Sequence, residues 1–273
     1  MNRLVVVRGA GDLATGTIVR LVHAGFRVVA LETASPTAIR RSVSLAEAVF
    51  GGATKVEDVE GRLAKDPAEA LALAGPRVVP LLIDPAAASL PELHPAALVD
   101  AILAKRNLGS RRGMAPVVIG LGPGFTAGGD SELDVDAVIE TNRGHDLGRV
   151  IVEGCAAADT GVPGEIGGVT GERVLRSPAA GRFRARSEIG QRVSGGEIVA
   201  VVEGEGCSEI RSRIDGIVRG MLRSGTEVSE GFKVADVDPR SRPEHCFSIS
   251  DKSRAIGGAV LEALLMFGAD RQS

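Results

Sequence analysis

Six short apolar runs, separated by polar turns and helix-forming stretches, organise the first half of the chain. They lie at Leu4–Val7, Val28–Leu31, Val78–Ile83, Leu98–Leu103, Val117–Leu121 and Ala137–Ile139. Continuous apolar runs of this length are typical of strands buried on both faces of a parallel sheet. Together with the intervening helices and turns, they predict an α/β fold with a Rossmann-like, mostly parallel sheet.

The first apolar run leads into a glycine-rich turn within the sequence VVVRGAGDLATG. Gly9 allows a tight turn, and Gly11 lets a phosphate approach the backbone at the start of the following helix. Glu32 closes the second run about 20 residues later, where a ribose-binding carboxylate is expected. Asp12 suits a helix cap, but its charge would repel a pyrophosphate. A turn that only joins strand and helix, with no ligand, remains an alternative.

Polar or glycine-rich residues also follow the other runs, and the carboxyl ends of parallel strands share one edge of the sheet, where ligands bind. Arg40 and Arg41 lie in the sequence near the expected position of a ribose 2′-phosphate, so an NADP-like ligand remains an alternative. The predicted cofactor-binding residues are Gly9, Gly11, Asp12, Glu32, Asp84, Lys105, Arg106, Asn107, Gly122, Gly124, Thr126 and Arg143.

The sequence offers fewer candidates for catalysis than for cofactor binding. His145 beside Asp146 is a possible acid/base pair, although capping is an equally good role for Asp146. Cys155 is a nucleophile only if a nearby cation lowers its pKa. No histidine spacing indicates a metal site, and whether the chain catalyses a reaction stays open.

The second half contains an internal repeat with an offset of 35 residues. Gly181 matches Gly216, and Gly190 matches Gly225. The pattern resembles the small all-β barrel-sandwich hybrid of biotinyl and lipoyl carrier domains. The hairpin between the halves reads EGEGCSEI, with Cys207 and no lysine, so neither lipoate nor biotin is expected.

These patterns divide the chain into a cofactor-binding domain (1–170), the barrel-sandwich hybrid (171–240) and a tail (241–273). In the tail, Cys246 to Ile249 are expected to form a strand. A helix capped by Ser250 or Asp251 then returns to the first domain, and Gly257 and Gly258 let it lie close to another backbone.

The composition and charge reduce the classes of partner and location that fit the chain. The net charge of −3 does not favour nucleic acid or a membrane surface, and no apolar run is long enough for a membrane helix. Three cysteines without a C-x-x-C pair favour a reducing, cytoplasmic location. A homo-oligomer remains possible.

Longer motifs add a family resemblance. VVVRGAGDLATG, VDAILAKRNLG, APVVIGLGPGFTAG, VIETNRGHDLGRVI, TGVPGEIGG and ISDKSRAIGGAVLEA resemble the accessory protein family of the selenium-dependent molybdenum hydroxylase system, which is related to xanthine dehydrogenase accessory factors. The resemblance implies a role in hydroxylase maturation. It also implies a hydroxylase or its maturation machinery as partner, and a molybdopterin-type cofactor such as molybdopterin dinucleotide.

Two other functions fit the residues. Gly9, Gly11, Ala14 and Glu32 are compatible with an NAD(P)-dependent oxidoreductase. A non-catalytic adaptor that docks a hydroxylase through the barrel-sandwich module is the third possibility.

Overall fold

The computed structural model describes residues 3–162 and 164–269, and the chain forms two compact units. Unit 1 consists of Met1–Pro36, Ser44–Thr160 and Ile249–Ser273. Unit 2 consists of Thr37–Val43 and Gly161–Ser248. The short segment Thr37–Val43 is thus separated in sequence from the rest of the unit in which it lies.

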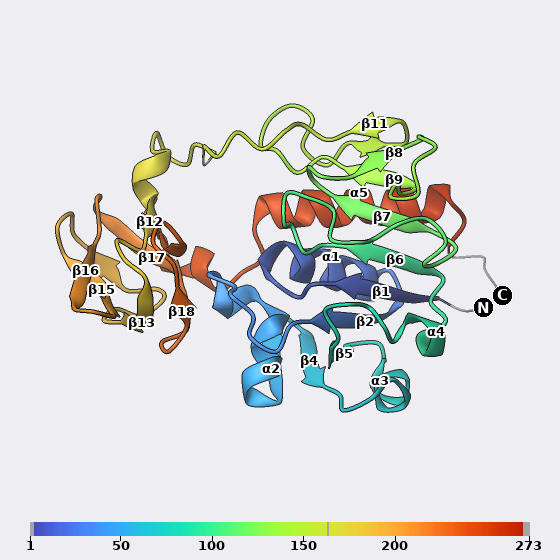
Figure 1. Cartoon of the computed structure of the whole chain (residues 1–273), viewed down its shortest axis with the longest axis horizontal. Coiled ribbons are helices and arrows are strands. Elements are labelled where there is room, and N and C mark those ends of the chain that lie inside the picture. The colour runs from blue at the N-terminus through green and yellow to red at the C-terminus, as the bar shows by residue number, and fades with distance from the viewer. Residues whose placement is uncertain (1–2, 163, 270–273) are drawn as a thin grey trace. The chain divides into compact units, whose positions relative to one another are not determined.

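Unit 1 is built on a nine-stranded sheet with the order β10-β9-β7-β6-β1-β2-β5-β4-β3 (Figure 1). Its strands are β1 (Leu4–Arg8), β2 (Arg27–Glu32), β3 (Ala53–Val56), β4 (Val59–Leu63), β5 (Val78–Ile83), β6 (Ala97–Asp100), β7 (Val118–Leu121), β9 (Ala137–Ile139) and β10 (Val150–Ile151). All neighbours from β4 to β9 pair in parallel, and only β3 and β10 pair antiparallel, at the two edges. The predicted α/β fold with a mostly parallel sheet is confirmed.

Each of the six predicted runs contains a strand, and most of the apolar side chains in these strands are buried. Val5, Val6 and Val7 of the central strand β1 have no exposed surface. The fourth run is shorter than predicted, since β6 ends at the buried Asp100 rather than at Leu103.

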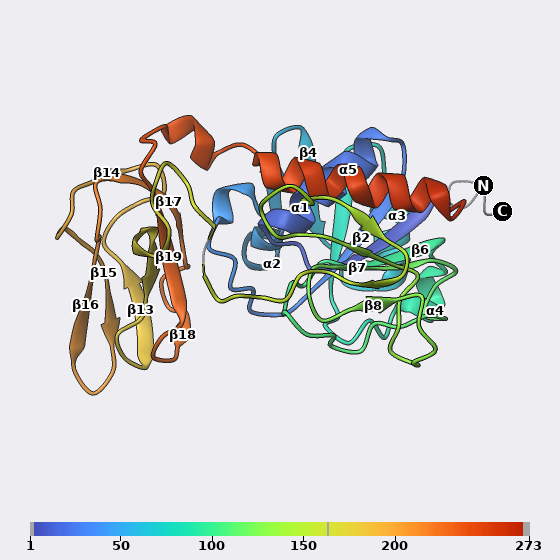
Figure 2. The same cartoon turned by 90° about the horizontal axis from the view of Figure 1, so that it is seen from above.

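Helices α1 (Asp12–His23) and α5 (Asp251–Met266) lie side by side along unit 1 (Figure 2). Their backbones meet through glycines. A Cβ on Gly16 would lie 2.5 Å from that of Ser253, and a Cβ on Gly257 would lie 2.8 Å from the Gly16 carbonyl oxygen. The expectation of a close helix approach therefore holds for Gly257, whereas Gly258 faces open space.

The remaining elements of unit 1 are short. They are the 3-10 helix η2 (Leu45–Glu47), the helices α2 (Ala48–Gly51), α3 (Pro67–Leu73) and α4 (Leu90–Leu93), and a two-stranded sheet of β8 (Thr126–Ala127) and β11 (Gly154–Cys155). Among residues 3–162 and 164–269, no helix combines the length and apolar character required to cross a membrane.

Unit 2 contains two antiparallel four-stranded sheets around one apolar core that includes Phe183. Their orders are β12-β19-β17-β14 and β16-β15-β13-β18. The strands are β12 (Val174–Arg176), β13 (Gly181–Ala185), β14 (Arg192–Val193), β15 (Ile198–Glu203), β16 (Cys207–Arg211), β17 (Gly216–Met221), β18 (Glu227–Val228) and β19 (Lys233–Asp238). β17, β18 and β19 begin 35 residues after β13, β14 and β15. The matched Gly190 and Gly225 both have a φ of 95°, which favours glycine in each turn.

The strand predicted at Cys246 to Ile249 is wrong. Cys246 is instead the last residue of the 3-10 helix η4 (Pro243–Cys246), which has Pro243 in its first turn, and residues 247–249 form no strand. Proline has a fixed φ and no N–H group, so it suits this position. The predicted helix cap is confirmed, because the Ser250 hydroxyl accepts a hydrogen bond from the Ser253 N–H group at 3.2 Å.

Candidate functional site

The turns that follow four neighbouring strands lie together at one edge of the large sheet. A Cβ on Gly9, after β1, would lie 3.0 Å from the carbonyl oxygen of Ala101, after β6. Gly124, after β7, packs directly against the backbone of Arg106. A Cβ on Gly122 would lie 2.6 Å from Oγ1 of Thr141, which follows β9. This is the edge predicted from the sequence.

The edge contains a topological switch point. β1 pairs with β2 on one side and with β6 on the other, so the connections from the centre of the sheet diverge here. Ligands of open parallel sheets commonly bind where the strand order reverses in this way.

Gly11 lies at the start of α1 and next to this switch point. It is the N-cap residue, has a φ of −68° in an extended conformation, and makes no side-chain cap hydrogen bond. Apart from its chain neighbours, no atom of residues 3–162 and 164–269 lies within 4 Å of the position that a Cβ would occupy there. The first turn of a helix presents backbone N–H groups and a positive partial charge, and at Gly11 the space beside it is open.

Glu32 braces this turn from within the protein. Its Oε2 atom accepts a hydrogen bond from the Ala10 N–H group at 2.8 Å, and its Oε1 atom accepts one from the Thr33 N–H group at 2.8 Å. Asp12 accepts a hydrogen bond from the Ser253 hydroxyl at 3.1 Å, which links α1 to α5. Glu32 and Asp12, two of the three predicted site carboxylates, therefore stabilise the turn and its helices.

A buried ion pair at the same edge was missed in the sequence. Arg8 donates to Asp100 Oδ2 at 3.1 Å, to the Ser110 hydroxyl at 2.6 Å and to the Pro85 carbonyl at 2.8 Å. Ser110 also donates to Asp100 at 2.6 Å. The signal that could have revealed this pair was a charged residue directly after the first apolar run, Arg8, and another inside the fourth run, Asp100.

Several predicted binding side chains shape their own loops. Burial opposes ionisation of Asp84, but hydrogen bonds from Ser89 and Ala88 hold its pKa below the usual value. The Asn107 side-chain oxygen accepts from the N–H groups of Gly109 and Ser110, which closes the loop after β6. Both groups have structural partners in place of a ligand.

The predicted cations lie on the surface of unit 1. Lys105 pairs with Asp159 at 2.6 Å, and Arg143 pairs with Asp251 through two contacts of 2.8 and 3.0 Å. Arg106 is exposed. Such exposed pairs contribute about 0–1 kcal/mol, so a bound anion could replace the carboxylates.

In the part of the chain that the structure describes, no hydrogen bond or ion pair joins the catalytic candidates to one another. The Asp146 carboxylate pairs with Arg149 at 3.2 Å rather than with His145. Cys155 is exposed on β11, opposite Thr126 of β8. Among the described residues, no group of three or more His, Cys, Asp or Glu side chains is placed to hold a metal ion.

A cavity of about 690 Å³ opens at the ends of β4 and β5. The carboxylates of Asp66, Glu69, Asp84 and Glu92 and a single ammonium group, from Lys65, line it. Its negative charge disfavours phosphate, so this cavity is not the predicted anion site.

Arg40 and Arg41 belong to unit 2, in the short segment Thr37–Val43. One nitrogen of Arg40 donates to the carbonyls of His245 and Ser248 at 3.0 and 3.2 Å, and Arg41 donates to the Met221 carbonyl at 2.7 Å. Both arginines thus have partners within unit 2, and their proximity to a ribose 2′-phosphate stays a prediction.

Comparison with known proteins gives one curated relative. No model of a known protein family matches the chain. The uncharacterized protein YqeB of Escherichia coli (strain K12) is 53% identical over 265 residues, which are 97% of this chain and 48% of that protein. The chain thus spans about half the length of the curated relative that it matches.

Similar solved structures come from succinylglutamate desuccinylase and aspartoacylase proteins. An aspartoacylase family protein from Mesorhizobium loti covers 86% of this chain and 83% of its own, with 14% identity and a TM-score of 0.27. A succinylglutamate desuccinylase/aspartoacylase from Rhodobacter sphaeroides is 26% identical over 24% of this chain and 22% of its own, with a TM-score of 0.22. Superpositions this weak do not support transferring an activity to this chain.

These findings contradict the family expected from the motifs. The similar structures are desuccinylase and aspartoacylase proteins, not accessory proteins of a molybdenum hydroxylase, and the curated relative is uncharacterized. The expected maturation role, its selenium-dependent system and a hydroxylase partner are therefore wrong, and the oxidoreductase and adaptor alternatives are not supported. The physical reason is visible in the motifs, whose glycines and acids form turns, helix contacts and caps that the fold itself requires.

Proposed function

We propose that unit 1 binds the phosphate group of a nucleotide-type ligand at the turn between β1 and α1. The proposal depends on one observation: Gly11 leaves the N-terminus of α1 open at the switch point of the sheet. Backbone N–H groups and the helix dipole at such a position favour an anion. Because the Ala10 N–H group already binds Glu32, the phosphate is expected to contact the first turn of α1 instead.

The neighbouring loops supply the remaining predicted contacts. Gly122 and Gly124 have φ values of 79° and 103°, and they bring the loop after β7 against Arg106. Lys105, Arg106 and Arg143 are surface cations that can neutralise phosphate charge. A molybdopterin-type cofactor and NAD(P) both stay predictions as ligands, and a cytoplasmic location stays a prediction as well.

Substitution of Gly11 tests this proposal. The φ of −68° and the open space permit alanine without strain, so Gly11→Ala should fold normally. The added methyl group would stand where a phosphate approaches, and we expect affinity for the nucleotide to fall at least about tenfold, or about 1.4 kcal/mol. The measurement is isothermal titration of the full chain with AMP, ADP, NAD and NADP.

Gly51→Ala is the matched control, because Gly51 also lies in unit 1 and, beyond its local backbone, no described atom lies within 4 Å of the position that its Cβ would occupy. It should bind as the wild type does. Equal affinity in Gly11→Ala and wild type, or no binding by any of the four nucleotides at millimolar concentration, would refute the site. Replacing Lys105 and Arg106 together with alanine should weaken binding further without affecting folding.

We also propose that unit 1 is Rossmann-like and that unit 2 is a barrel-sandwich hybrid. The switch point supports the first assignment, and the two sheets with their 35-residue strand offset support the second. Cys207 begins β16 where a carrier domain would present its lysine, so neither lipoate nor biotin is expected there.

A further inference from the structure

Unit 2 buries an arginine whose charge is incompletely paired. Arg219 is 6% exposed on β17, and its Nε atom has no hydrogen-bond partner. Its nearest carboxylate oxygen is Asp238 Oδ2, 3.4 Å from Nη1. A buried cation is costly unless it is paired and hydrogen-bonded.

Asp238 is already engaged by another arginine. Arg240 donates to Asp238 Oδ2 at 2.6 Å and to Oδ1 at 2.9 Å, and its backbone N–H group adds a third bond to Oδ1 at 3.0 Å. The second aspartate on β19, Asp236, pairs with Arg173 at 2.7 Å. Arg219 is therefore the weaker partner of a shared carboxylate.

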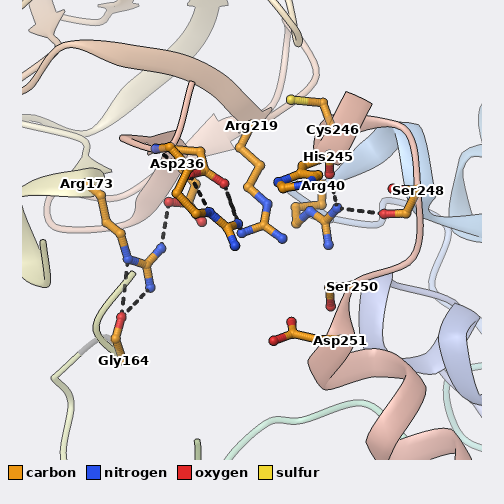
Figure 3. A network of polar contacts seen from close by, with 12 residues as sticks. Arg40, Gly164, Arg173, Arg219, Asp236, His245, Cys246, Ser248, Ser250 and Asp251 are labelled. Carbon is orange, nitrogen blue, oxygen red and sulfur yellow. Dashed lines mark hydrogen bonds and ion pairs between the residues drawn. The ribbon is translucent and has the colours of Figure 1, made fainter. Parts of the chain in front are cut away.

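A second guanidinium group lies beside it. Figure 3 shows Arg219 and Arg40 with their guanidinium ends next to each other. Burial, and then the nearby charge of Arg40, lower the pKa of Arg219 below its usual range. A like charge this close adds to the cost of the incompletely paired Arg219 guanidinium, and a negative group beside Arg219 would lower that cost.

The local backbone holds this arrangement in place. The register of β17 against β19 shifts between Val218 and Gly220, so Arg219 is the extra residue of a β-bulge. Bulges redirect a side chain and are frequent next to binding sites. A Cβ on Gly220 would lie 2.9 Å from Ile39, so the missing side chain lets the segment with Arg40 pack directly on β17.

We propose that Arg219, together with Arg40 and Arg240, binds a doubly charged oxyanion, namely the phosphate group of a small molecule. The planar fork of a guanidinium group matches tetrahedral oxyanions, and the buried Arg219 has an Nε atom left to donate to one. This site belongs to unit 2 alone, so it is independent of the nucleotide site proposed for unit 1.

Inorganic phosphate is the first probe, titrated against the full chain at constant ionic strength with chloride as the reference anion. Ligand binding to the folded state raises the melting temperature in proportion to the logarithm of ligand concentration at saturation. We expect wild type to gain stability with phosphate and Arg219→Met to lose that gain, with at least about a tenfold weaker Kd. Arg219→Lys, which keeps the charge but not the fork, should be intermediate.

Arg182→Met is the matched control, because Arg182 lies in the same unit but is exposed and paired with Glu227 at 2.9 Å. It should respond to phosphate as wild type does. Gly11→Ala should also keep the phosphate response, which separates failure of this site from failure of the nucleotide site.

Hydrogen–deuterium exchange of the wild type adds a test that needs no variant. Phosphate should slow amide exchange in β17 and in residues 37–43. An equal phosphate response in wild type and Arg219→Met, or unchanged exchange in these segments, would overturn the proposal. Glycerol 3-phosphate should act like free phosphate if the natural ligand is a phosphomonoester. Equal protection by succinate would overturn the assignment to phosphate.

Discussion

Arg8 in unit 1 and Arg219 in unit 2 are equally hidden but differently bonded. They are 4% and 6% exposed, and each has an Nε atom without a partner. Arg8 makes three hydrogen bonds, to Asp100, Ser110 and Pro85. Arg219 has one ion-pair contact of 3.4 Å, to a carboxylate that it shares with Arg240. Burial alone therefore does not reveal the role of an arginine, whereas its bonding does: Arg8 stabilises the fold, and Arg219 has bonding capacity left for an anion.

The largest effect is expected from Arg8→Met. Removing the arginine leaves Asp100 buried without its cation, and breaking a buried pair in this way costs about 3–5 kcal/mol. Amide exchange in β1 and β6 measures the loss within unit 1, and β17 should be unaffected. A cost below about 1 kcal/mol would remove the distinction between the two arginines.

Asp238→Asn tests the carboxylate shared in unit 2. Burial opposes ionisation of Asp238, but hydrogen bonds from Arg240 hold its pKa below the usual value. A lowered folded-state pKa contributes stability above about pH 4, the pKa in the unfolded chain, and that stability is lost as pH falls through the folded pKa. The variant should lose about 1–3 kcal/mol at pH 7 and less at pH 3. Amide exchange in β19 at the two pH values measures this, with the exposed Glu227→Gln as control; equal losses at both pH values would contradict it.

Gly258→Ala gives a reference effect on the stability of unit 1 without changing a charge. Gly258 is inside α5 and faces open space, so alanine should stabilise the helix by about 1 kcal/mol. Gly257→Ala should destabilise instead, because its Cβ would lie 2.8 Å from the Gly16 carbonyl oxygen. Thermal unfolding followed by circular dichroism distinguishes the two, and a shift of the same sign in both would disprove the packing of α1 on α5.

Arg219→Met should have the smallest effect on stability when phosphate is absent. Asp238 keeps its bonds to Arg240, and replacing a poorly paired buried charge by an apolar side chain is often neutral. We expect a change within about 1 kcal/mol by amide exchange in β17. A loss as large as that of Arg8→Met would assign Arg219 to the framework of unit 2.

The sequence predicted the strands of unit 1 because each is a continuous apolar run, such as Val78–Ile83. It also located the turns at Gly9 and Gly122 at one edge. It did not predict which polar groups at that edge are already hydrogen-bonded within the protein. Glu32 accepts from the Ala10 N–H group in the turn after the neighbouring strand, and Asp84 accepts from the Ser89 N–H group five residues later. Long-range hydrogen bonds were also missed. Arg40 donates to the carbonyl of His245, which lies about 200 residues later in the sequence, and no local sequence pattern indicates such a contact.

The interleaved connectivity has a consequence for cutting the protein apart. Residues 37–43 complete unit 2, where the Ile39 carbonyl accepts a hydrogen bond from the Met221 N–H group at 2.8 Å. A fragment of residues 161–248 would therefore leave one face of β17 uncovered and would lack Arg40. A peptide of residues 37–43 supplied in trans should restore that cover, so the two pieces would behave as a split protein that reassembles.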